Sequence, residues 1–259
     1  TIDGDDTVFA ADTTVTTDSA NNPASQLVVV ENSTLDNQGT INSKVQVDGT
    51  LKGSGTVNGT VSVSKGGSLV IGNSPGHMSI SSVVLAGDLE ISVDGVDTAS
   101  TSGNVGWGSG TYSQLTLTEG QLSILTGASI KILFGGDTIF DGTMNKEISF
   151  DMAIITGITD FTINGVDAIS ATGTLTETAV QFLVENTVFG LTGETLGLPT
   201  VGEALSGLTV TESTYELVES TETGKYELHV KGKMLVPEPA TATLSLLALA
   251  ALAARRRRK

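Results

Sequence analysis

Carboxylates are the side chains of this sequence best suited to bind a metal ion. Asp3, Asp5 and Asp6 lie together near the first residue, and Asp137 and Asp141 lie around glycine-containing turns. Calcium prefers oxygen ligands of this kind. However, the sequence contains neither the twelve-residue calcium loop nor the Gly-Gly-x-Gly-x-Asp repeat that would order such ligands. Solvated acidic turns are therefore the favoured interpretation, and we predict no metal site.

Groups for covalent or acid–base catalysis are scarce. The 259 residues include no cysteine and two histidines, His77 and His229, which lie far apart in the sequence. An isolated histidine is more often a surface or hydrogen-bonded residue than one half of a metal-binding pair. No Gly-x-Ser-x-Gly elbow stands between a strand and a helix, and the sequence has no Walker loop or His-Glu-x-x-His motif. We predict that the protein is not an enzyme and needs no cofactor.

A single aromatic residue points to a carbohydrate ligand. Trp107 is the only tryptophan, and it lies in the stretch 94–110, rich in Gly, Ser and Thr, which we expect to be a long loop. An exposed indole ring can stack on a sugar, although such a residue more often folds back onto the core. Trp107 is therefore the candidate glycan contact. It keeps open an alternative function as a carbohydrate-binding or carbohydrate-active protein.

The charge of the chain argues against one class of partner. The formal net charge is −16, and the last five residues supply five of the 13 basic side chains. Residues 1–254 thus carry 29 acidic residues against eight lysines and no arginine, a net charge of −21. Such a body repels phosphate backbones, so we predict no nucleic-acid binding. The lack of arginine also removes the usual bidentate clamp for carboxylates and weakens a polysaccharide-lyase interpretation.

The C-terminal segment 235–259 combines three features that point to membrane sorting. Pro237, Glu238 and Pro239 cannot continue a helix and stay extended, a shape that a membrane protease can bind by strand pairing. Next comes an apolar run, about 22 Å long as a helix and shorter than the roughly 20 residues of a full membrane span. Its leucines are Leu244, Leu246, Leu247, Leu249 and Leu252. It ends in a cytoplasmic stop formed by Arg255, Arg256, Arg257, Arg258 and Lys259.

This order of Pro-Glu-Pro, short apolar helix and arginine cluster resembles the PEP-CTERM protein-sorting signal. The resemblance implies export, transient anchoring in the inner membrane of a Gram-negative bacterium, and processing near the motif by an exosortase-type membrane protease. It also implies delivery to the cell surface or an extracellular polysaccharide matrix. A plain tail anchor is the simpler alternative. With such a tail, we expect Thr1 to follow a removed signal peptide rather than to be a fragment edge.

The body of the chain has the periodicity of β-strands. From residue 28 to residue 93, apolar residues alternate with polar ones over short stretches, which places one face of each strand inward. A recurring unit of glycine, a small or polar residue and an aliphatic residue separates these stretches. We expect its glycine to supply a positive-φ corner, after which the chain enters a strand. The unit begins at Gly39, Gly49, Gly55, Gly59, Gly67 and Gly87.

Many short strands with glycine corners occur in two architectures. In a β-sandwich, Asp48-Gly49 and Asn58-Gly59 would be hairpin turns. In a parallel β-helix, each turn of chain stacks on the one before. Very short strands, frequent corners and 4% aromatic residues favour the β-helix, whose core is a set of aliphatic ladders.

The sequence also resembles the autotransporter-associated β-strand repeat. The resemblance is carried by residues 49–63, which run from Gly49-Thr50-Leu51 to Val61-Ser62-Val63, and by the turn Gly72-Asn73-Ser74-Pro75-Gly76. Its clearest part covers residues 39–130. The family implies a right-handed parallel β-helix in a surface-exposed passenger protein.

We therefore predict an all-β body over residues 1–234, a right-handed parallel β-helix (solenoid) of about ten turns at roughly 20–25 residues each. Residues 177–189 fit either a buried strand or a short helix, and alternating stretches around residues 220–224 predict a terminal hairpin. A sorting signal with a short hydrophobic helix occupies residues 235–259. The expected function is that of an exported structural or adhesive protein, with an exosortase and surface glycans or exopolysaccharide as partners.

Overall fold

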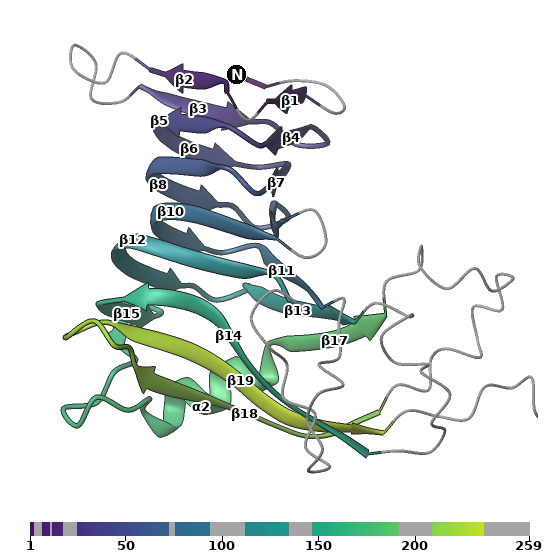
Figure 1. Cartoon of the computed structure of the whole chain (residues 1–259), viewed down its shortest axis with the longest axis vertical. Coiled ribbons are helices and arrows are strands. Elements are labelled where there is room, and N and C mark those ends of the chain that lie inside the picture. The colour runs from purple at the N-terminus through teal and green to yellow at the C-terminus, as the bar shows by residue number, and fades with distance from the viewer. Residues whose placement is uncertain are drawn as a thin grey trace, which may run out of the picture.

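Two β-sheets organise the chain, as seen in a computed structural model that describes residues 1–2, 7–10, 12–17, 25–72, 76–93, 112–134, 147–191 and 209–235. Strands stack in tiers from the N-terminal end of the molecule towards a curved sheet at the other end (Figure 1). Consecutive strands mostly alternate between a 7-stranded and a 12-stranded sheet.

The 7-stranded sheet consists of β1 (Thr7–Phe9), β4 (Thr34–Asn37), β7 (Thr50–Gly53), β9 (Ser68–Ile71), β11 (Asp88–Val93), β13 (Ser129–Phe134) and β17 (Thr187–Leu191). The 12-stranded sheet consists of β2 (Thr14–Thr16), β3 (Gln26–Val29), β5 (Thr40–Asn42), β6 (Lys44–Val47), β8 (Thr56–Val63), β10 (His77–Leu85), β12 (Gln114–Ile124), β14 (Glu147–Ile158), β15 (Asp160–Ile163), β16 (Val166–Asp167), β18 (Thr209–Glu219) and β19 (Tyr226–Leu235).

The strands from β1 to β13 pair in parallel, and we call them the parallel stack. Each pairs with the strand one circuit of chain later, such as β4 with β7, β7 with β9 and β8 with β10. The predicted parallel stacking of these strands is therefore confirmed over the described residues of β1 to β13. One circuit takes 28 residues from Thr7 to Leu35, 16 from Thr34 to Thr50 and 18 from Thr50 to Ser68. The last two of these circuits are thus shorter than the 20–25 residues expected.

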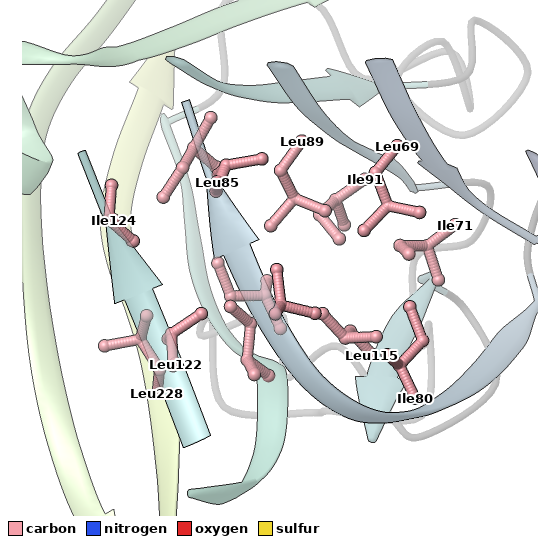
Figure 2. Close-up of a cluster of buried hydrophobic side chains, with 14 of the residues drawn as sticks. Leu69, Ile71, Ile80, Leu85, Leu89, Ile91, Leu115, Leu122, Ile124 and Leu228 are labelled. Atoms are coloured by element: carbon pink, nitrogen blue, oxygen red, sulfur yellow. The ribbon is translucent and has the colours of Figure 1, made fainter. Parts of the chain in front are cut away.

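Aliphatic ladders fill the interior of the parallel stack. Leu35, Leu51, Leu69 and Leu89 are in register on successive strands of the 7-stranded sheet, and each is at most 1% exposed. The facing sheet contributes equivalent rows, of which Ile80, Leu115 and Leu122 appear in Figure 2. Period-2 alternation in the sequence therefore identified the buried residues correctly, because in-register pairing places identical strand positions above one another.

The recurring glycines are needed for a different reason from the one expected. The residue that follows each of them does lie in a strand, but none of these six glycines has a positive φ. A Cβ atom on Gly59 would instead lie 2.2 Å from the carbonyl oxygen of Ser43, and one on Gly55 would lie 2.4 Å from that of Gly39. Close approach of backbone between neighbouring circuits excludes a side chain there.

The C-terminal part of the fold has a different pairing. β19 lies between β14 and β18 and is antiparallel to both, and we call these three strands the terminal sheet. The predicted hairpin around residues 220–224 is β18–β19. The ambiguous stretch 177–189 divides into helix α2 (Glu177–Glu185) and the start of β17. Thr176 caps the helix by accepting a hydrogen bond from the Ala179 amide at 3.2 Å.

Three phenylalanines join the last strands of the two sheets. The rings of Phe134, Phe150 and Phe189 lie with centroids 5.8–6.4 Å apart. They come from β13, β14 and β17, so the 7-stranded sheet and the terminal sheet share a core at this end of the molecule. Within the described residues, no helix is long and apolar enough to cross a membrane.

Candidate functional site

Uncharged polar side chains cover one outer face of the parallel stack. Six hydroxyl residues are in register on successive strands of the 12-stranded sheet, and all are at least partly exposed. We call them the hydroxyl row: Thr14, Thr40, Thr56, Ser79, Thr116 and Thr156. Strand spacing repeats these hydroxyls about every 4.8 Å. Beside the row, the amide of Asn58 donates to Asn42 at 2.8 Å, so part of this face is tied together across circuits.

The outer face of the 7-stranded sheet is charged instead. Asp36 lies opposite Lys52, and Glu90 lies opposite Lys131. Lys131 also forms an ion pair with Asp88 at 2.6 Å. Burial raises the pKa of Glu90, the charge of Lys131 partly offsets this, and the charge of Asp88 adds to it. These are charges on neighbouring strands of the sheet, paired across the ladder.

A small polar network joins two circuits near a corner of the parallel stack. The Asp48 carboxylate accepts hydrogen bonds from Ser64 at 2.7 Å and from Gln46 at 3.0 Å. Gln46 also donates to Ser64 at 2.6 Å. The hydrogen bonds that Asp48 accepts from Ser64 and Gln46 lower its pKa, because they favour the ionised carboxylate. The network fixes a charged corner and has no feature of a ligand site.

The densest charge cluster lies on the outer face of the terminal sheet. His229 contacts Asp151 through Nδ1 at 2.7 Å and Glu227 through Nε2 at 3.4 Å. Lys231 bridges Asp151, at 3.4 Å, and Glu216. Glu227, His229 and Lys231 lie at alternate positions along β19. Asp151 of β14 is paired with Lys231, and Glu216 of β18 is paired with His229. The cluster was not foreseen from the sequence, although the alternation Glu227-His229-Lys231 against Leu228 and Val230 was a visible signal of a charged outer face.

Two buried tyrosines lie close to this sheet, and both are held neutral. The Tyr112 hydroxyl accepts a hydrogen bond from the Ala153 amide at 3.2 Å, and burial raises the pKa of Tyr112. Burial also raises the pKa of Tyr215, whose hydroxyl shares a 2.7 Å hydrogen bond with Thr187. A phenol held neutral is a poor base at neutral pH.

Most residues singled out from the sequence lie outside the described part of the chain. These are Trp107, the carboxylates Asp3, Asp5, Asp6, Asp137 and Asp141, the motif Pro237–Pro239, the leucines of the apolar run and the basic cluster. Of the two histidines, His77 is exposed at the start of β10, and strands β12 and β14 separate it from His229 on β19. Among the residues that the structure describes, no group of three or more metal-ligating side chains converges.

Of the sorting segment itself, the structure describes the residue where it begins. β19 ends at Leu235, and Val236 alone separates this residue from Pro237. At its end, β19 is paired on both sides, since Leu235 lies opposite Glu147 of β14 and Thr209 of β18. The segment thus continues directly from the central strand of the terminal sheet.

Comparison with known proteins gives one match. Residues 235–259 match the PEP-CTERM protein-sorting motif. No curated protein and no solved structure matches the chain. The match covers the predicted Pro-Glu-Pro, the apolar run and the basic cluster. The chain thus carries a PEP-CTERM sorting motif at its C-terminal end, which indicates an exported protein that passes through a membrane-anchored stage and is processed by an exosortase, a membrane protease.

Proposed function

We propose that the protein is a structural or adhesive component of the bacterial cell surface or extracellular matrix. Its body would be a right-handed parallel β-helix rod, and the tail would deliver the rod and then be removed. The observation that carries this proposal is a stack of in-register parallel strands in the same chain as a sorting motif, which begins at the last residue of β19. A rigid rod with repeated outer rows suits display better than catalysis, which needs converging groups.

The surface of the parallel stack supports this interpretation. Its outer rows are hydroxyls and amides on one sheet and scattered charges of both signs on the other. Uncharged exopolysaccharide or surface glycans would be suitable partners for the hydroxyl row, because hydroxyls both donate and accept hydrogen bonds and carry no charge to desolvate. We found no specific observation that favours an enzyme on this scaffold, and Trp107 lies outside the described residues.

The delivery step is tested in the bacterium that makes the protein. We expect the surface or matrix fraction to hold a form that lacks residues 240–259, because the apolar run is too short for a comfortable permanent anchor. Mass spectrometry of that fraction measures the C-terminus. Replacing Pro237, Glu238 and Pro239 with alanine should leave a full-length protein in the inner membrane. Recovery of surface protein that still ends in Lys259 would contradict the proposal and favour a plain tail anchor.

The adhesive role has its own test on the same rod. Thr56→Asp places a charge in the hydroxyl row, whereas Thr50→Asp places it on an equally exposed position of the other sheet. We expect the first variant to reduce retention of the protein in an uncharged polysaccharide matrix and the second to leave retention unchanged. Equal retention of both variants would leave the rod as a structural component without a binding face.

A further inference from the structure

The position of the sorting segment creates a conflict between two uses of the same backbone. A protease that binds its substrate as an extended strand engages several residues on both sides of the bond that it cuts. On the body side of Pro237 these are residues 233–236. In the fold, three of these four residues belong to β19 and are paired with two neighbours. The same peptide groups cannot serve the sheet and the protease together.

Distance gives the second half of the conflict. One residue of extended chain spans about 3.3 Å. Leu235 is still paired with Glu147 and Thr209, the first residues of β14 and β18, so only Val236 separates the paired end of β19 from Pro237. While the terminal sheet is closed, the folded body would sterically hinder access of the protease to the bond that it cuts.

We propose that the tail is cut while the end of β19 is detached from β14 and β18, and that the terminal sheet closes around this end only afterwards. The proposal rests on the processing described under the proposed function. In the cut, water adds across a peptide bond near Pro-Glu-Pro. Its hydroxyl goes to the carbonyl carbon on the body, and its proton goes to the amine that leaves with the apolar run.

The pairing of β19 defines how far the strand opens. Val230 is fully buried, and Lys231 bridges carboxylates on both flanking strands, so the strand is firmly held up to that point. Beyond it, the register with β18 shifts between Val210 and Glu212, so the regular pairing of the two strands is interrupted there. Opening therefore stops at Gly232, which frees residues 233–236 and leaves the buried half of β19 in place.

A crosslink across the end of β19 tests the order of events. Ser149 and Lys233 are opposite one another on β14 and β19, so Ser149→Cys with Lys233→Cys can form a disulfide in an oxidising periplasm. We expect the full-length crosslinked protein to be cut at least about tenfold more slowly, because proteolysis follows the population of the open form. A form that ends in Lys259 then accumulates in the membrane, and a thiol reductant restores cutting.

Two further variants separate this effect from misfolding. Val218→Cys with Glu227→Cys crosslinks β18 to β19 near the other end of the same strand and should leave cutting at the wild-type rate. A six-residue Gly-Ser insertion between Leu235 and Val236 in the locked variant should restore cutting without reductant. Wild-type cutting of the locked protein, or no rescue by the insertion, overturns the proposal. If the wild-type protein itself keeps Lys259 at the surface, the proposed processing is what fails.

Discussion

The parallel stack and the terminal sheet are built from one acidic chain, yet they use different interactions on their outer faces. In the parallel stack, successive circuits repeat the same residue types at the same positions, so aliphatic rows form inside and the neutral hydroxyl row forms on the outer face of the 12-stranded sheet, whereas the 7-stranded sheet carries scattered charges outside. In the terminal sheet, strands far apart in sequence meet, and opposite charges such as Lys231 with Glu216 and Asp151 pair across them. Repetition suits neutral ladders, because a repeated charge would repel its own copy.

The largest expected difference between the two regions comes from backbone contact. Gly59→Ala places a methyl group 2.2 Å from the Ser43 carbonyl, so neighbouring circuits must separate. We expect a loss of about 3 kcal/mol or more in the free energy of unfolding, measured by urea titration. Gly66→Ala is the matched control, since its methyl group has free space and costs about 1 kcal/mol for the positive φ alone. Equal losses would show that circuit contact is not what requires Gly59.

A cavity in the aliphatic ladder should have the next largest effect. Leu51 is fully buried between Leu35 and Leu69, so Leu51→Ala leaves a cavity that its ladder neighbours cannot fill. We expect destabilisation of about 3 kcal/mol in the same titration. Thr50→Ala, one position away on the outer face, should change the free energy of unfolding by less than about 0.5 kcal/mol. A loss of under 1 kcal/mol for Leu51→Ala would mean that the ladder repacks.

The dependence of the unfolding free energy on salt should also distinguish the two regions, with a smaller effect. Lys231→Met removes a cation that contacts two carboxylates on the terminal sheet, and we expect a loss of up to about 1 kcal/mol at low ionic strength. Screening should reduce this loss in 1 M salt. The charge-free pair Asn42 and Asn58 in the parallel stack offers the contrast, because the effect of Asn58→Ala should not depend on salt. A salt-independent loss for Lys231→Met would show that packing of its aliphatic stem matters more than its charge.

The smallest predicted effects concern pH and have opposite signs within the parallel stack. The pKa of Asp48 is lowered in the fold, so its carboxylate stabilises the protein above the ordinary value of 3.8, and this is lost as pH falls through the folded pKa. The pKa of Glu90 is raised, so its stabilising effect is present at acid pH and disappears as pH rises from 4.5 through the folded pKa. At pH 7, Asp48→Asn should destabilise and Glu90→Gln should stabilise, each by less than about 0.5 kcal/mol.

Melting curves of both pH variants at pH 3 and pH 7 measure these signs. Each difference from the wild type should shrink at pH 3. Glu90 then binds its proton in the folded and unfolded states, and pH 3 lies below the ordinary value of 3.8 for Asp48, where its stabilising effect is being lost. A destabilising effect of Glu90→Gln at pH 7 would mean that the charge of Lys131 outweighs the burial of Glu90.

Sequence periodicity predicted the parallel stack well because the same short pattern repeats from one circuit to the next. Leu51 and Leu69 could be recognised as equivalent, since each is the aliphatic residue of the same glycine unit. The reason for the glycines was not accessible, because the contact of Gly59 with Ser43 depends on how circuits stack rather than on local turn geometry. The charge cluster of the terminal sheet was also missed. Asp151 and His229 are 78 positions apart, and no repeat linked their strands.

The lengths of the circuits imply a direction of folding. Partners in the 7-stranded sheet are separated by 28 residues between Thr7 and Leu35, by 16, 18 and 20 along the strands from β4 to β11, and then by 41 between Asp88 and Ser129 and by 57 between Ile130 and Thr187. Closing the longest of these loops costs about 1 kcal/mol more in chain entropy than closing the shortest. Nucleation is therefore cheapest among the circuits from β4 to β11, and growth proceeds by adding one circuit at a time to an existing edge. An exported chain that emerges N-terminus first would assemble in the same order in which it arrives.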